Sequence, residues 1–300
     1  MAKSSLAING EYFALRFFCA VVNAMPYAMA MTIARALGWM MFCVFRFQRR
    51  RTLGRIRSVF PAMDDRQACA VAIRSLQNVL QTGVEMMRAP KLDRAWMDRY
   101  VKDGQHYERR LQKYVDEGNG VVIMVPHCGN WYMAAWAMAK YGLKLFAIAA
   151  RQRNPKLNAW MNRQYGDIEV LDRDNRDTLV KIRDYLDVGR AFAILPDLRV
   201  RKRDVSVDFF GGKANVSHAG AMYAVRSGCP IVVAMMRREN GRHCFNHIAT
   251  LRPDPKATDR KAEAARLTQE AMSLLSAEIM KLPGEWFWYN KRWILEPPEE

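Results

Sequence analysis

The sequence predicts an α/β fold: a largely parallel central sheet flanked by helices, with an N-terminal apolar helical hairpin. Short apolar runs bounded by turn residues, at 120–126 and 191–196, are typical of strands buried on both faces. Segments with helical spacing alternate with these runs, which is the order of β-α-β units and of a parallel sheet. The N-terminal hairpin is predicted from a long stretch that is poor in charge.

The first 47 residues carry only five charged side chains, namely Lys3, Glu11, Arg16, Arg35 and Arg46. The uncharged run at 17–34 is at the lower limit of length for crossing a bilayer, and Pro26 interrupts it. We therefore expect two helices that lie in or dip into one leaflet. The arginine-rich stretch at 46–57 is expected to attract anionic headgroups. A soluble helical subdomain with a solvated basic turn is the alternative.

Residues 48–300 are predicted to form one α/β domain with helices and strands in alternation. The expected elements, in chain order, are a helix at 64–88, a helix after Pro90, a strand at 120–126, a helix at 130–140, a strand at 143–150, a helix at 178–188, a strand at 191–196, a helix at 219–227, strands at 230–236 and 245–251, and a helix at 259–281.

The chain is strongly basic, with 47 Lys and Arg against 30 Asp and Glu and a net charge of +17. Such a surface attracts nucleic acid, anionic lipid or an acidic protein. The apolar N-terminus and the lack of a recognisable nucleic-acid-binding module argue against nucleic acid. The six cysteines form no Cys-x-x-Cys pair, and His243 and His247 are too far apart on a predicted strand to share one ion. No metal and no cofactor are expected.

The most informative residue is His127, which follows the strand at 120–126. In an open α/β sheet, ligands bind at the carboxyl ends of the strands, where loops lead into helices. Asn130 is expected to cap the next helix, and Tyr132 lies in its first turn. Cys128 is more typical of a buried cysteine than of a nucleophile. We therefore expect His127 to act at a ligand site.

Basic side chains also follow predicted strands. They form the clusters Arg199, Arg201, Lys202 and Arg203, then Arg237, Arg238 and Arg242, and finally Lys291 and Arg292. Each cluster can be a solvated face. Because several follow strands, we expect them to meet His127 at one sheet edge and to bind a phosphorylated ligand or an acidic carrier.

Several motifs together resemble the bacterial late acyltransferases of lipid A biosynthesis (lauroyl/myristoyl acyltransferases), within the lysophospholipid acyltransferase superfamily. Residues 127–132, His-Cys-Gly-Asn-Trp-Tyr, resemble the family's His-x-x-Asn-Trp-Glu. The remaining matches are Arg151 with Asn154-Pro155, Pro196-Asp197, Phe209-Phe210-Gly211, Gly220, Arg237-Arg238, and residues 288–293, which resemble Trp-x-His-Arg-Arg-Phe. The likeness runs in order from the apolar N-terminus to about residue 293.

The resemblance implies acyl transfer from a thioester, on acyl carrier protein or CoA, to a hydroxyl of a glycolipid such as a lipid A precursor. It implies a membrane-associated segment at 1–47 and an acyltransferase-like domain at 48–300, at the cytoplasmic face of the inner membrane. His127 is then the general base, with Tyr132 at the position of the usual acid. The implied substrate-binding residues are Asn130, Arg151, Asp197, Arg199, Arg201, Phe210, Gly211, Arg237 and Arg292.

The chain departs from the family pattern at Tyr132, which replaces the acid, and at Asn290, which replaces a histidine. A neutral phenol stabilises an imidazolium less than a carboxylate does. Two interpretations follow: an active enzyme in which Tyr132 or a distant acid such as Asp197 supports His127, or an impaired relative that binds lipid or carrier protein. Lysophospholipid or an amino-acid lipid is an alternative acceptor to a glycolipid.

Overall fold

The computed structural model describes residues 4–118 and 120–297. Its strands are β1 (Val101–Lys102), β2 (Val121–Met124), β3 (Leu145–Ala149), β4 (Glu169–Asp172), β5 (Ala191–Ile194), β6 (Val205–Phe209), β7 (Gly212–Val216), β8 (Ile231–Glu239) and β9 (Arg242–Leu251). Seven of them form one sheet in the order β1-β9-β8-β2-β5-β3-β4, and β6 pairs with β7. All pairs in the large sheet are parallel except the hairpin β8–β9. The predicted largely parallel sheet is confirmed.

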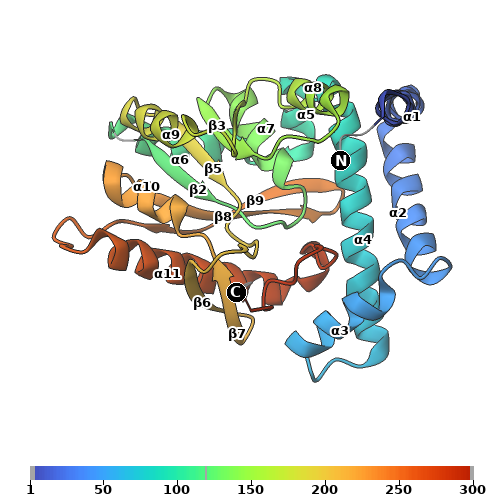
Figure 1. Cartoon of the computed structure of the whole chain (residues 1–300). Helices are drawn as coiled ribbons and strands as arrows, with labels where there is room; N and C mark the ends of the chain where they lie inside the picture. The colour runs from blue at the N-terminus through green and yellow to red at the C-terminus, as the bar shows by residue number, and fades with distance from the viewer. Residues whose placement is uncertain (1–3, 119, 298–300) are drawn as a thin grey trace.

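Helices cover both faces of this sheet (Figure 1). They are α1 (Ser5–Ala24), α2 (Tyr27–Cys43), α3 (Arg49–Val59), α4 (Asp65–Arg88), α5 (Arg94–Tyr100), α6 (Gly104–Asp116), α7 (Trp131–Tyr141), α8 (Pro155–Gln164), α9 (Thr178–Asp187), α10 (Ala219–Ser227) and α11 (Arg260–Lys281), with short 3-10 turns at Ala89–Lys91 and Pro283–Glu285.

Alternate residues of the central strand β2 face opposite layers, as the pleat of a strand requires. Val122 and Met124 pack in the core with α9, α10 and α11, whereas Val121 and Ile123 pack in the core with α5, α6 and α7. All four side chains are buried. This two-sided burial explains why the strand appears in the sequence as an unbroken apolar run.

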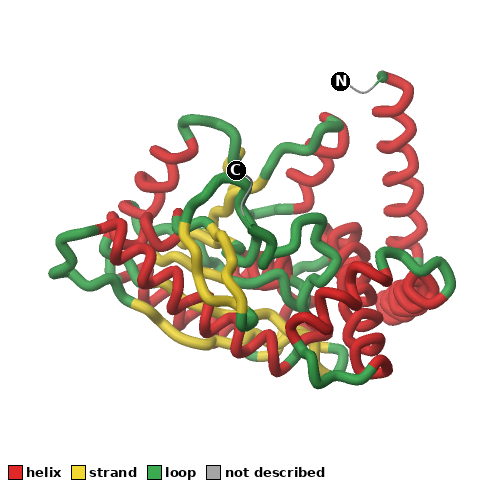
Figure 2. The backbone as a smooth tube through the Cα atoms, turned by 60° about the horizontal axis from the view of Figure 1, so that its bottom comes forward, coloured by secondary structure: helices red, strands yellow, loops and turns green. Residues whose placement is uncertain are grey.

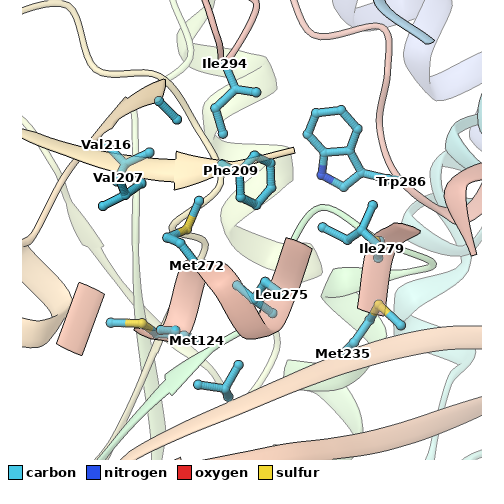
Figure 3. Close-up of a cluster of buried hydrophobic side chains, with 14 of the residues drawn as sticks. Met124, Val207, Phe209, Val216, Met235, Met272, Leu275, Ile279, Trp286 and Ile294 are labelled. Atoms are coloured by element: carbon cyan, nitrogen blue, oxygen red, sulfur yellow. The ribbon is translucent and has the colours of Figure 1, made fainter. Parts of the chain in front are cut away.

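The hairpin β6–β7 closes the core below α11. Figure 3 shows Phe209 and Trp286 beside one another, with Met272, Leu275 and Ile279 of α11 in the same cluster. The two-residue turn Phe210-Gly211 has positive φ at both positions, 53° and 75°, as a type I′ hairpin requires. The C-terminal segment is therefore part of the core that packs against the central strands.

The predicted N-terminal pair of apolar helices is confirmed, with the break between Ala24 and Tyr27. Helix α2 packs along α4 so closely that a Cβ on Gly38 would lie 2.9 Å from the Cα of Gln77. Helix α1 turns away from α2, as the two views show (Figure 1, Figure 2). Its residues are mostly exposed, and α1 is long and apolar enough to cross a membrane by length and composition.

The sequence did not predict the helices α3, α6 and α8, the short strand β1, the edge strand β4 or the hairpin β6–β7. Strand β4 carries Glu169 and Asp172 and pairs on one side only, so it lacks the apolar run of a central strand. Helix α8 is a short helix that begins at Pro155 after the capping residue Asn154.

Candidate active site

The site is built by two neighbouring strands that run in parallel register. Met124 of β2 pairs with Ile194 of β5, and the residues three positions further along each chain are His127 and Asp197. Imidazole Nδ1 of His127 lies 2.8 Å from Oδ1 of Asp197, and the His127 backbone N–H donates to Oδ2 at 2.7 Å. The register of the sheet thus brings a histidine and a carboxylate together.

Asp197 is held as an ionised acceptor. Its side chain is fully buried, and Trp286 Nε1 donates to its Oδ2 at 2.8 Å. Burial alone would raise the pKa of the Asp197 carboxyl, but the adjacent His127, the Trp286 indole and the His127 backbone amide together lower it below its ordinary value. The carboxylate therefore accepts hydrogen bonds on both oxygens.

The turn that carries His127 is fixed by the strand and tail beside it. Gly129 has φ +54°, and a Cβ there would lie 2.2 Å from the carbonyl oxygen of Met236 in β8. Its N–H donates to the Glu285 carbonyl, and Phe287 N–H donates to the His127 carbonyl, each at 3.0 Å. Only glycine fits at this close approach, so the C-terminal segment and β8 together set the position of the imidazole.

An apolar cavity of about 140 Å³ lies beside the imidazole. His127 lines it together with side chains from β2, β3, β4, β5 and α7, among them Ile123, Met138, Ile148 and Ala193. The His127 side chain is 14% exposed. Because Nδ1 is bonded to Asp197, Nε2 is the nitrogen available to a bound molecule.

Tyr132 lines this apolar cavity instead of bonding to the imidazole. Its ring stacks on Trp136 at 5.7 Å between centroids. Among the described contacts, no hydrogen bond joins Tyr132 to His127, whose Nδ1 is bonded to Asp197. Burial raises the pKa of the Tyr132 phenol, against an opposing contact with Trp131. The geometry therefore favours the distant acid, Asp197, as the partner of His127.

Asn130 is a fully buried structural link. Its Oδ1 accepts from the Met133 N–H at 3.0 Å and so caps α7, while its Nδ2 donates to Glu85 at 2.6 Å. Asn130 therefore has both ends of its amide occupied by protein groups.

Cys128 is also buried, and burial together with Asp197 and Glu285 raises the pKa of its thiol well above the ordinary value, which disfavours a thiolate nucleophile.

A second buried carboxylate, Glu85 of α4, lies behind the His127 turn. It accepts from Arg238 on both oxygens, at 2.8 and 2.5 Å, and from His243 Nε2 at 2.9 Å. Burial would raise its pKa, but Arg238 and His243 lower the Glu85 pKa well below the ordinary value. This network joins α4, the α7 cap and the hairpin β8–β9.

The structure spreads the predicted arginines over several places. Arg151 lies 3.3 Å from Asp172 and is 75% exposed. Arg199 donates to the Glu296 and Pro297 carbonyls, and Arg201 is exposed in the same loop. Arg237 contacts Glu239 at 3.4 Å, and its buried Nε has no partner among the described atoms. None of these four is among the described residues that line the His127 cavity.

Two of the remaining predicted residues, Phe210 and Gly211, support the site from the core side. Phe210 is buried and packs edge-on against Trp286 at 5.1 Å, and Gly211 completes the hairpin turn. Phe210 therefore helps to hold the indole that bonds to Asp197. Arg292 is half-buried in the C-terminal segment.

Sequence reasoning did not assign roles to Trp286 or Glu85. The signal for Trp286 was its place in an aromatic-rich tail. The signal for Glu85 was a polar stripe at helical spacing, Asn78, Gln81, Thr82 and Glu85, all of which are buried.

Comparison with known proteins identifies the family. A family model described as bacterial lipid A biosynthesis acyltransferase matches residues 2–294. A phosphatidylinositol mannoside acyltransferase of Mycolicibacterium smegmatis is 25% identical over 265 residues, which cover 84% of this chain and 81% of the relative. A phosphatidylinositol mannoside acyltransferase of Mycobacterium tuberculosis is 24% identical over 263 residues, with coverages of 84% and 78%. The chain thus belongs to the bacterial lipid A biosynthesis acyltransferase family and is an acyltransferase.

Proposed function

We propose that this acyltransferase moves a fatty acyl group from a thioester, on acyl carrier protein or CoA, to a hydroxyl of a membrane glycolipid, with His127 as the general base. The observation that carries the proposal is the pair His127–Asp197 at an apolar cavity. The two mycobacterial relatives are named for a mannosylated phosphoinositide, which is a phosphorylated glycolipid. A lipid A precursor has the same chemical character, so a glycolipid is favoured over a lysophospholipid or an amino-acid lipid.

The chemistry proceeds by direct attack. His127 Nε2 takes the proton of the acceptor hydroxyl as its oxygen bonds to the thioester carbonyl carbon. The tetrahedral intermediate then collapses, the carbon–sulfur bond breaks, and the imidazolium returns its proton to the departing thiolate. Asp197 stabilises the imidazolium that exists between these two steps. The products are an ester and a thiol, with no acyl-enzyme.

The cavity beside His127 is proposed to hold the start of the acyl chain. An apolar lining with one titratable group at its edge suits a hydrocarbon whose carbonyl must reach the imidazole. Tyr132, in this proposal, shapes the acyl cavity instead of orienting His127. With Asp197 supplying the carboxylate, replacement of the family's acid by Tyr132 is compatible with an active enzyme, which favours activity over the impaired relative.

We further propose that residues 1–47 associate with the membrane and that residues 48–300 form the catalytic domain at the cytoplasmic face of the inner membrane. Exposed apolar side chains on both N-terminal helices support membrane association. They are Leu6, Phe13, Phe17, Phe18 and Val21 of α1 and Met29, Ile33, Leu37 and Trp39 of α2.

A donor and acceptor panel tests the proposed function. The full chain in mixed micelles is offered radiolabelled acyl carrier protein thioester or acyl-CoA, together with a lipid A precursor, a phosphatidylinositol mannoside or a lysophospholipid. The proposal expects label in a glycolipid ester, and a rate of labelling lower on the order of 10²- to 10⁴-fold when His127→Ala replaces the wild type. Transfer to the lysophospholipid alone would overturn the glycolipid assignment, and no transfer from either thioester to any acceptor would favour the impaired relative.

A further inference from the structure

A second and larger cavity, of about 620 Å³, lies between α2, α4, α5 and the turn that joins β8 to β9. Five arginines line it: Arg35, Arg74, Arg99, Arg238 and Arg242. No aspartate or glutamate is among the described residues that line it, and none of these residues lines the apolar cavity of His127. The cavity is therefore a separate site with a strongly positive wall.

The positive charge of this wall is only partly balanced by the protein. Arg74 pairs with Glu285 at 2.8 Å and Arg238 pairs with Glu85 at 2.5 Å, both carboxylates lying behind the cavity. Among the described residues, no carboxylate lies within ion-pair distance of Arg35, Arg99 or Arg242. Three exposed guanidinium groups thus meet in one concave surface without an internal anion.

The lining has the polar groups that a phosphate requires. A guanidinium presents a planar fork of N–H donors that matches phosphate oxygens. Tyr100 adds a hydroxyl group to the same wall, whereas the Thr32 hydroxyl donates to the Ala28 carbonyl and accepts from Arg35. Gln81, which is only 6% exposed, also lines the cavity, and its Oε1 has no hydrogen-bond partner in the described structure. A buried acceptor without a partner normally indicates an absent donor, so this oxygen can accept from a water or a ligand hydroxyl, while phosphate oxygens are bound by the arginines.

Helix α2 links this cavity to a membrane surface. Its Ala30, Ala34 and Gly38 are buried toward α4, whereas Ala28, Thr32 and Arg35 line the cavity. A third side of the same helix exposes Met29, Ile33 and Leu37. A guanidinium beside an exposed apolar helix face is placed where lipid headgroups lie when that face enters the acyl region.

We propose that this arginine-lined cavity binds the phosphate of an anionic phospholipid while the exposed side of α2 contacts the acyl chains of the same leaflet. The inference rests on the proposed membrane association, and it assigns a lipid site distinct from the one where acyl transfer occurs. Figure 1 shows the ends of β8 and β9 beside α4, on the side of the molecule where α2 lies. The cavity therefore lies where the catalytic domain meets its N-terminal helices.

The test uses the full chain in nonionic detergent micelles, titrated with phosphatidylglycerol carried in the same detergent, with the bound fraction measured by native mass spectrometry. The variant is Arg35→Gln with Arg99→Gln and Arg242→Gln, which leaves the paired Arg74 and Arg238 in place. We expect binding to weaken on the order of 100-fold, from the usual contribution of a basic side chain at an anionic lipid surface.

A matched control removes the same charge elsewhere: Arg109→Gln with Arg176→Gln and Arg260→Gln. These three arginines are exposed and lie in or beside α6, α9 and α11, away from α2 (Figure 1). The control should bind phosphatidylglycerol as the wild type does. Equal weakening in both triple variants would mean that only the overall charge of +17 matters, and the cavity assignment would be wrong.

A charge-conserving variant, Arg35→Lys with Arg99→Lys and Arg242→Lys, separates a built site from a diffuse field. Lysine keeps the charge but not the planar fork, so binding should fall clearly below the wild type. Wild-type affinity in this variant would overturn the proposal. Glycerol 3-phosphate tests the source of the phosphate: it should compete poorly, and displacement of phosphatidylglycerol at equal concentration would assign the cavity to a soluble phosphate instead.

The binding assay needs no turnover, so the two proposals can fail separately. A wild type that binds phosphatidylglycerol through the cavity but transfers no acyl group would overturn the proposed function alone. A wild type that transfers acyl groups while the cavity variant and its control bind phosphatidylglycerol alike would overturn this inference alone.

Discussion

Two buried clusters in this protein place a carboxylate against a histidine, and they differ in what else the carboxylate contacts. Asp197 meets His127 and the neutral indole of Trp286, and the histidine borders a cavity. Glu85 meets His243 but also the permanent cation of Arg238, and the histidine is 1% exposed. In the first arrangement the negative charge of Asp197 is available to stabilise a transient imidazolium. In the second, Arg238 already neutralises the negative charge of Glu85.

The difference shows how one pair of residue types serves two purposes. A carboxylate without a fixed counter-ion stabilises a proton on its histidine, as general-base catalysis requires. A carboxylate paired with a buried arginine forms a structural ion pair. The arginine already balances its charge, so protonation of the adjacent histidine is not stabilised. The following changes test this distinction, beginning with the largest expected effect.

Loss of the proposed catalytic pair, His127 and Asp197, should have the largest effect. His127→Ala and Asp197→Asn are each expected to lower kcat/KM on the order of 10²- to 10⁴-fold, because the base is absent in one and its charged form is unsupported in the other. Initial rates with a saturating thioester donor measure the loss. Asp208→Asn, at an exposed acid, is the control and should keep full activity. An Asp197→Asn enzyme with wild-type rate would show that another group supports His127.

Breaking the structural cluster should affect stability instead. Glu85→Gln leaves the buried Arg238 without its counter-ion and is expected to lower the free energy of unfolding by about 3–5 kcal/mol. Asp197→Asn, which exposes no buried cation, should lower it by less. Urea unfolding followed by tryptophan fluorescence makes the comparison.

A double variant checks the cause of this loss. Glu85→Gln with Arg238→Met removes both charges and should be more stable than Glu85→Gln alone. A double variant that is less stable than the single one would contradict the ion-pair account.

The proposed catalytic pair was more visible in the sequence than the structural cluster. His127 and Asp197 follow apolar runs that could be recognised as buried strands, and both belong to motifs of the family. Their contact depends on the pairing of β2 with β5, which no local pattern specifies. Strand order is set by packing between distant segments, so the sequence supported Asp197 only as one of two candidates.

Glu85 could not be found by the same method because its helix changes character along its length. The first half of α4 buries apolar Ala68, Ala72 and Leu76, but the second half buries Asn78, Gln81, Thr82 and Glu85. A search for apolar periodicity instead selects Val79 and Leu80, which are only half-buried. The burial of the polar stripe requires Arg238 and Asn130 from remote segments, which explains why tertiary structure decides it.

Tyr132 offers a test between the two candidates for the partner of His127. Because its ring lines the apolar cavity, Tyr132→Phe should leave kcat/KM nearly unchanged. Tyr132→Glu puts a charge into that cavity and should lower kcat/KM on the order of 10- to 200-fold, the range that a mismatch in an apolar substrate pocket produces. Steady-state rates with donors of several chain lengths measure both variants. A faster Tyr132→Glu enzyme would show that the missing family acid limits the wild type.

The smallest expected effect is the pH dependence contributed by His243. Burial and the positive charge of Arg238 both lower the pKa of this imidazole. Together they outweigh Glu85, which alone would raise it. Its Nε2 donates to Glu85, and its Nδ1 has no partner in the described structure, as suits a neutral ring. In the unfolded chain the imidazole takes up a proton below about pH 6.5, whereas the folded chain resists protonation until the pH is lower.

The unfolded state therefore binds more protons in this window. The free energy of unfolding should fall as the pH drops from 7 toward the lowered pKa of the folded state. His243 contributes at most about 1.4 kcal/mol per pH unit to this fall. His243→Gln keeps a donor for Glu85 and should remove that part of the slope. Urea unfolding between pH 7.5 and 5.5 measures the variant and the wild type. A slope that is unchanged in His243→Gln would mean that His243 is protonated in the fold, and the contrast between the two histidine–carboxylate pairs would then lie in exposure alone.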